Sequence, residues 1–244
     1  MIYLYDNSFI GLLNLINYLL KNKIKPISIK PDNYDALLLD ELYYPIIKED
    51  ENLTDRIISK IGTYAFSVVY YVYLSNSEDK ELLIYNFLLE SLNYKDKICF
   101  MRNIDCVSMC LKISKYVKHE GHKFKGFVRF RDLGNGILYS EIEPENNILL
   151  ILSNHFKNRL KMEKWIINDK KRKLVSMYNG KEYYIFEKDI IINTSNISDD
   201  FENMWKSFYK NVSIKERANE RCRMNFMPKK YWKYIVEVED EKSC

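Results

Sequence analysis

The chain has 244 residues and a formal net charge of +4 at pH 7, with 47% hydrophobic and 30% charged residues. This length and composition predict a globular protein with one large or two small domains, and they exclude a disordered or fibrous chain. The longest near-apolar run, residues 61–74, is too short to cross a bilayer, so no membrane association is expected.

The N-terminal part of the sequence predicts a short strand, a helix and a second strand, followed by helices. Ser8 is a suitable N-cap for the first helix, and Pro31 ends the second strand. In chain order, the expected strands are residues 2–6 and 24–29, and the expected helices are residues 9–20, 53–74, 79–92 and 104–122.

The start of the chain and the cysteines favour a cytoplasmic location. Residues 1–6 lack the basic region of a signal peptide and read as a strand. The five cysteines are odd in number and without paired spacing, which suits a reducing compartment. Cys106 and Cys110 have the first spacing of an iron–sulfur motif, but Ile113 occupies the third ligand position, so both are interpreted as core thiols.

A β-hairpin is predicted around Gly134-Asn135-Gly136, with strands over residues 126–133 and 137–143. A three-residue loop pairs positions whose numbers sum to 270, which keeps the apolar residues of both strands on one face. In this register Arg129 lies opposite Glu141, and Arg131 opposite Tyr139.

The rest of the chain predicts further strands and helices. A helix is expected to start at Pro144 and end near Leu160, and a four-cation turn, residues 170–173, joins the first two of three strands. These strands are expected over residues 165–168, 174–178 and 182–186, and later helices over residues 199–211 (capped by Ser198) and about 214–225.

Together these elements predict an α+β protein. An N-terminal strand–helix–strand and helical block is followed by an antiparallel sheet of about five strands with packed helices. The expected division is residues 1–103 and 104–244, with one continuous domain as the alternative.

Positive charge is concentrated in two tracts. Residues 112–175 carry fifteen Lys/Arg against seven Asp/Glu, and residues 204–235 carry nine against two, which leaves −11 for the rest of the chain. The second tract interleaves cations with aromatic residues, a pattern that neutralises phosphates and stacks on bases, although a solvated helix face has the same composition. Pro228 separates Lys229–Tyr234 from the preceding helix, and we expect Trp232 to dock on the core.

No phosphate-binding loop, dinucleotide fingerprint or nucleophile elbow occurs, so no cofactor is expected. His119 and His122 are too close for a helical ligand pair, and no metal is expected. The weak catalytic candidates are His122, placed where a helix becomes a strand, His155 and Glu143. Glu141 and Glu143 share a strand face suited to a metal or an acid/base pair, and pairing with the nearby arginines is the simpler interpretation.

Several blocks of the chain form a recognisable combination. They are Tyr3-Leu4-Tyr5-Asp6 with Ser8-Phe9, the segment 122–130, Glu141-Ile142-Glu143-Pro144, Asn147-Ile148-Leu149, His155-Phe156, Glu216-Arg217 with Asn219, and the segment 226–234. Together they resemble a bacterial family of DNA repair or DNA metabolism proteins. Asn146 and Asn168 depart from the family pattern, where Asp or His is typical at the first position and His at the second. Genes of this family neighbour that of a radical SAM protein of DNA modification or repair, and a related domain is fused to uracil-DNA-glycosylase-like proteins.

The resemblance implies a DNA repair accessory protein that binds DNA, single- or double-stranded, and works with a radical SAM partner. The alternatives are an enzyme acting on DNA, a glycosylase or nuclease, and a protein–protein adaptor. The candidate nucleic-acid contacts are Lys123, Lys125, Arg129, Arg131, Arg159, Lys170, Lys171, Arg172, Arg217, Arg221, Lys229, Lys230 and Trp232.

Overall fold

The computed structural model describes residues 1–34, 42–45, 47, 50, 52–134, 136–190, 204–208, 211 and 219–235. These residues form two compact units, Met1–His119 and Glu120–Cys244, so the division lies inside helix α5 (Asp105–Phe127) and not before it. Each unit is described by itself below. The mixed α/β architecture agrees with the predicted fold class.

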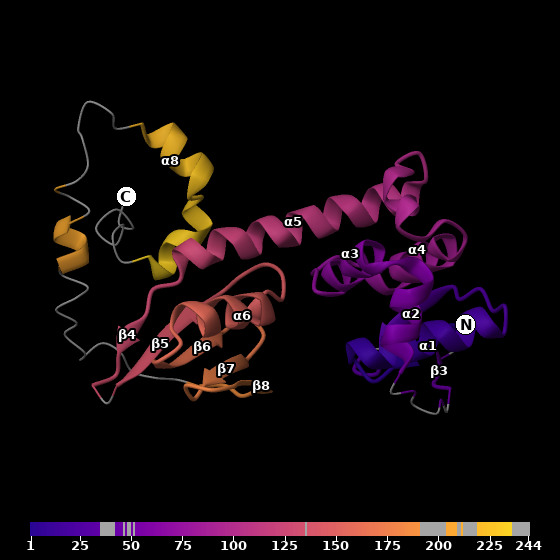
Figure 1. Ribbon diagram of the computed structural model, residues 1–244, viewed down its shortest axis with the longest axis horizontal. Coiled ribbons are helices and arrows are strands. Elements are labelled where there is room, and N and C mark those ends of the chain that lie inside the picture. The colour runs from indigo at the N-terminus through magenta and orange to yellow at the C-terminus, as the bar shows by residue number, and fades with distance from the viewer. Residues whose placement is uncertain are drawn as a thin grey trace. The chain divides into compact units, whose positions relative to one another are not determined.

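The first unit starts with a three-stranded parallel sheet in the order β2-β1-β3, followed by helices (Figure 1). Its elements before α5 are β1 (Ile2–Tyr5), α1 (Phe9–Lys21), β2 (Ser28–Pro31), β3 (Leu42–Tyr43), α2 (Leu53–Ile61), α3 (Thr63–Tyr73), α4 (Lys80–Tyr94) and the 3₁₀ helix η1 (Lys95–Phe100). The expected second strand starts later than predicted, because Lys23 has a positive φ and residues 24–27 lead from the helix end into Ser28.

Residues near the start of the sequence have a structural role in this unit. Ser8 caps α1 as predicted, its Oγ accepting the Gly11 N–H at 2.9 Å. The Asp6 carboxylate in turn accepts the Ser8 N–H and O–H. A Cβ at Gly11 would lie 1.8 Å from Asp6 Oδ1, so only glycine fits beside this carboxylate.

The helix predicted over residues 53–74 is broken in two at Gly62. Gly62 has φ +93°, and Asp96 Oδ1 accepts the Ala65 N–H at 2.8 Å in the first turn of α3. A Cβ at Gly62 would lie 2.2–2.4 Å from the Asp96 carboxylate. The break therefore needs a residue without a side chain, both for its backbone angle and to admit the capping carboxylate.

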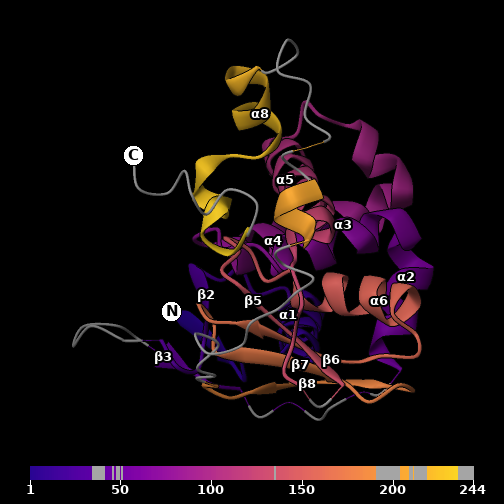
Figure 2. The ribbon, with the colours of Figure 1, turned by 90° about the vertical axis from the view of Figure 1, so that its left-hand side faces the viewer.

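The second unit contains a five-stranded sheet in the order β4-β5-β6-β7-β8, with α6 (Leu149–Arg159) against one face (Figures 1 and 2). Its strands are β4 (Arg131–Asp132), β5 (Ile137–Ile142), β6 (Lys164–Asp169), β7 (Leu174–Tyr178) and β8 (Tyr183–Glu187). The core side chains Tyr139, Leu152 and Trp165 are at most 1% exposed.

The sheet is mixed, and not purely antiparallel as predicted. β5 pairs parallel to β6, because α6 connects these strands as a crossover, and the other pairs are antiparallel. The predicted hairpin register is confirmed by the pairs Arg131↔Tyr139 and Asp132↔Leu138. However, α5 continues to Phe127, so the first hairpin strand is shorter than expected and its ladder does not reach Arg129.

The C-terminal part described by the structure consists of α8 (Glu220–Phe226), capped by Asn219, and the 3₁₀ helix η3 (Lys229–Tyr234). The break predicted at Pro228 is confirmed. The helix expected over residues 199–211 and its Ser198 cap lie largely outside the described residues, as does the start of the helix expected near residue 214. Within the described part of the chain, no helix has the length and apolar character needed to cross a membrane.

The role of Gly62 can be tested by Gly62→Ala. The substitution places a side chain at a positive φ and against Asp96, so we expect a loss of about 1–3 kcal/mol of stability. Gly126→Ala is the control, because Gly126 lies in α5 with open space around it. Thermal melting followed by circular dichroism should show a lower Tm for Gly62→Ala only. Equal Tm values would mean that Gly62 is not required for the break.

Candidate nucleic-acid interface

The polar residues of the second unit gather where β5 and β6 end. Because these strands are parallel, with Ile142 opposite Asp169, the loops that follow them leave the same edge of the sheet. In α/β proteins, ligands bind outside the carboxyl ends of parallel strands. We call the residues at this edge and on η3 the strand-end cluster.

A buried carboxylate on α5 holds the loop after β5. Glu120 is 2% exposed, and its oxygens accept the backbone N–H groups of Glu145 and Asn146, both at 2.9 Å. It also accepts the Asn146 side-chain amide at 2.6 Å and the Tyr231 hydroxyl at 3.3 Å. This explains why α6 starts at Leu149 and not at Pro144 as predicted, because two N–H groups of the loop are directed to Glu120.

An ion pair links the same loop to the turn after β6. Asp169 is fully buried, and its Oδ2 accepts the Arg172 guanidinium at 3.0 Å. Arg172 also donates to the carbonyl oxygens of Pro144, at 3.1 Å, and Glu145. Burial raises the pKa of Asp169, and the charge and hydrogen bonds of Arg172 offset part of that rise. Arg172 is therefore a structural cation, satisfied inside the fold.

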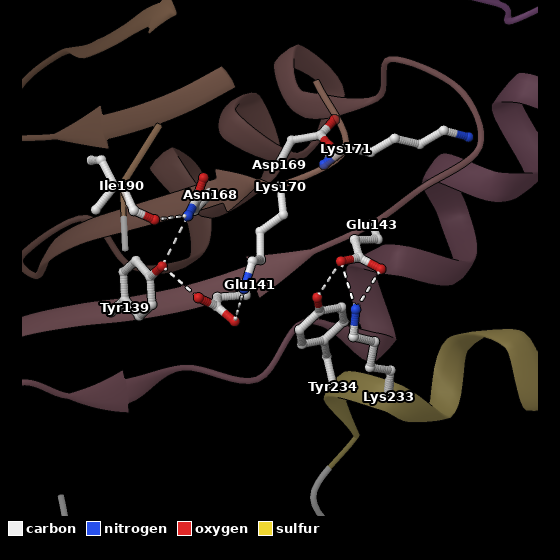
Figure 3. Close-up of polar contacts among 10 residues, drawn as sticks. All are labelled: Tyr139, Glu141, Glu143, Asn168, Asp169, Lys170, Lys171, Ile190, Lys233 and Tyr234. Atoms are coloured by element: carbon white, nitrogen blue, oxygen red, sulfur yellow. Dashed lines mark hydrogen bonds and ion pairs between the residues drawn. The ribbon is translucent and has the colours of Figure 1, made fainter. Parts of the chain in front are cut away.

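Nearer the surface, lysine ammonium groups pair with glutamates, and tyrosine hydroxyls donate hydrogen bonds to them (Figure 3). Glu143 accepts the Lys233 ammonium at 2.7 and 2.8 Å and the Tyr234 hydroxyl at 2.6 Å. Lys170 approaches Glu141 at 3.5 Å, and Lys230 pairs with Glu145. Glu141 also accepts the Tyr139 hydroxyl, to which Asn168 donates. The carboxylates at this edge are thus bound by lysine ammonium groups and tyrosine hydroxyl groups of the chain.

The two basic tracts meet in this cluster, and at their contact the lysines of η3 face the glutamates of the β5 loop. The expected pairing of Glu141 with Arg129 is wrong. The ion-pair partner of Glu141 is Lys170, and Arg129 donates to the carbonyls of Gly126 and Val128.

No group of three or more His, Cys, Asp or Glu side chains in the described part of the chain is arranged to hold a metal ion.

The tail docks through its aromatic residues, as expected. Trp232 is 6% exposed and donates its Nε1–H to the Met227 carbonyl at 2.8 Å. Tyr231 packs edge-on against Phe124 and also contacts Phe127 at the end of α5. Figure 1 shows η3 beside this end of the helix.

The predicted nucleic-acid contacts fall into different environments. Lys171, Arg159, Arg221 and Lys229 are exposed, and Lys229 lies 5.7 Å from the Trp232 ring centroid. Lys123, Lys125, Arg129 and Arg131 are half-buried, and Arg129 stacks over Trp205. Lys170, Lys230 and Arg172 are in the ion pairs described above, and Arg217 lies outside the described residues.

The catalytic candidates have different surroundings. His122 is exposed inside α5, and not at a helix-to-strand junction as predicted. His155 packs on Phe156, and its buried Nε2 has no hydrogen-bond partner among the described residues. Burial and the charges of Lys125 and Arg159 lower the pKa of His155.

Sequence reasoning missed the residues that organise the cluster. Glu120 shares a face of α5 with Val117 and Phe124, and an acid on an apolar helical face was the available signal. Asp169 and Arg172 were visible only as part of a charged turn, and Asn146 only as a departure from a family pattern.

Residues 78–237, about two thirds of the chain, match the family described as domain of unknown function DUF4130, and the chain belongs to this family. Neither the curated proteins nor the solved structures contain a significant match.

Trp232→Ala should lower the Tm. Truncating a buried Trp costs about 3–5 kcal/mol, because the vacated space is only partly filled. Phe226→Ala is the matched control, since Phe226 lies in the same part of the chain and is 74% exposed. Unchanged melting of Trp232→Ala with weakened single-strand DNA binding would instead make Trp232 a direct DNA contact.

Glu143 should make stability depend on pH. Partial burial raises the pKa of Glu143, but the bonds from Lys233 and Tyr234 lower it overall. A carboxyl group whose pKa is lowered by folding stabilises the protein above its unfolded pKa, and this contribution disappears as pH falls. Glu143→Gln should therefore reduce the loss of Tm between about pH 5 and pH 3. Glu163→Gln, an exposed glutamate outside the cluster, is the control, and identical pH profiles for both variants would contradict the assignment.

Proposed function

We propose that this DUF4130 protein is a DNA repair accessory protein that binds nucleic acid through the second unit. The observation that carries the proposal is the charge of that unit: residues 120–244 contain 24 Lys/Arg and 19 Asp/Glu, and residues 204–235 within it carry nine Lys/Arg against two Asp/Glu. Such a local concentration of cations attracts polyanions and is typical of a nucleic-acid-binding face.

The strand-end cluster supports this proposal by the way it distributes charge. Its acids pair with Lys170, Arg172, Lys230 and Lys233, so the negative charge near the surface is neutralised within the fold. Lys171 and Lys229 are exposed beside it, on the docked η3 in the case of Lys229 and on the turn after β6 in the case of Lys171. Asp169 Oδ1 holds that turn by accepting the Lys171 and Arg172 N–H groups. Cations on fixed elements contact phosphates with less loss of side-chain and loop entropy than cations on free segments.

The partner and the pathway come from the sequence resemblance. We infer that the protein works with a radical SAM enzyme in the cytoplasm, and that any radical chemistry belongs to that enzyme. A second candidate is an enzyme acting on DNA, with His155 as the general base, because its Nε2 has no hydrogen-bond partner among the described residues.

DNA binding should weaken steeply as salt increases. About five phosphate contacts give a slope of about −4.5 for log K against log salt on duplex DNA. Lys171→Ser with Lys229→Ser should make this slope shallower by about 2, because two phosphate contacts are lost. Lys25→Ser with Lys97→Ser, exposed lysines of the first unit, is the control. Fluorescence anisotropy with labelled single- and double-stranded oligonucleotides provides the measurement.

Absence of binding at about 50 mM salt would disprove the DNA-binding proposal. Multiple-turnover base release or strand cleavage by the wild-type protein alone would favour the enzyme, and loss of that turnover in His155→Gln would identify the base.

A further inference from the structure

The first unit contains an apolar groove that has no part in the proposed DNA binding. The groove has a volume of about 340 Å³ and lies between α1, α2 and α4. Each helix contributes apolar side chains spaced four residues apart, namely Ile16 and Leu20, Ile57 and Ile61, and Leu88 and Leu92. Side chains at this spacing share one helical face, so the groove is lined by three apolar ridges.

The floor of the groove is packed and its edge is open. Ile16 and Ile61 are each 1% exposed and Leu88 is 3% exposed, whereas Leu92 is 45% exposed. Leu20 and Ile57 are half-buried. Covering these side chains removes apolar surface from water, which favours association with an apolar partner surface.

The polar residues around the groove that the structure describes are three cations and one neutral amide. They are Lys21, Arg56, Lys60 and Asn17, and none of the described lining residues is Asp or Glu. Arg56 is paired with Asp50, whereas Lys21 and Lys60 have no acidic partner among the described residues. The charge preference of the groove therefore comes from these two lysines.

We propose that this groove binds an amphipathic helix of a partner protein, with apolar residues at i, i+3, i+4 and i+7 and acidic residues beside them. Ridges formed by side chains four apart accept the ridges of another helix, which is the way amphipathic helices occupy apolar grooves. Lys21 and Lys60 select acidic flanks, and they disfavour the basic flanks of a DNA-binding segment.

The test uses the full-length protein and two labelled peptides of about 15 residues, long enough to form a helix. Both carry Leu at i, i+3, i+4 and i+7, with Glu on the polar face of one and Lys on that of the other. Fluorescence anisotropy should detect binding of the acidic peptide, with at least about tenfold lower affinity for the basic one.

Two variants assign binding to the groove. Leu92→Asp should lower the affinity for the acidic peptide at least about tenfold, because it places a negative charge at the apolar edge, where the peptide is also negative. Leu89→Asp is the control, since Leu89 is on the same helix, is 37% exposed and does not line the groove. Lys21→Glu with Lys60→Glu should reverse the preference toward the basic peptide. DNA affinity, measured in parallel, should not change in any of these variants.

The proposal is wrong if the acidic peptide does not bind, if Leu92→Asp and Leu89→Asp behave alike, or if both peptides bind equally. A titration with dodecanoate tests whether the groove binds a small anionic amphiphile instead of a helix. Binding of dodecanoate that Leu92→Asp abolishes, without binding of the acidic peptide, would assign the groove to a small molecule and would also overturn the helix proposal.

Discussion

The second unit depends on the buried carboxylate of Glu120. Removing a carboxylate from water is costly unless hydrogen bonds replace the lost hydration. Glu120 obtains them from the backbone of Glu145 and Asn146, the Asn146 amide and the Tyr231 hydroxyl. One side chain on α5 thus fixes both the loop after β5 and the docked tail, which lie far apart in the sequence.

A second set of contacts depends on the position of this loop. Because the loop after β5 is fixed, its carbonyl oxygens can accept Arg172, and Arg172 can compensate the buried Asp169. Glu143 and Glu145 are then placed to bind Lys233 and Lys230 of η3. The cluster is therefore a stabilised scaffold, and under the proposed function the cations that contact phosphates are those at its border, such as Lys171 and Lys229.

The two units present different surfaces, which suits a protein with more than one partner. The second unit combines a five-stranded sheet with a surplus of cations. The first offers an apolar groove formed by three helices, with two lysines at its edge. An accessory protein of the proposed kind requires one surface for nucleic acid and another for protein, and the two proposals can be tested separately because their residues do not overlap.

The sequence alone determined those features of the structure that depend on a few neighbouring residues. Ser8 marked the first helix start, Pro228 the break before η3, and the glycine loop the register of Arg131 against Tyr139, since caps, proline and hairpin turns act over a few residues. Only the tertiary structure decided the parallel pairing of β5 with β6, the break at Gly62 and the partners of Glu141 and Arg172. These depend on residues such as Asp96 and Glu120, whose contacts are distant in sequence, and the charge pattern that suggested free cations did not reveal which ones the fold had already paired.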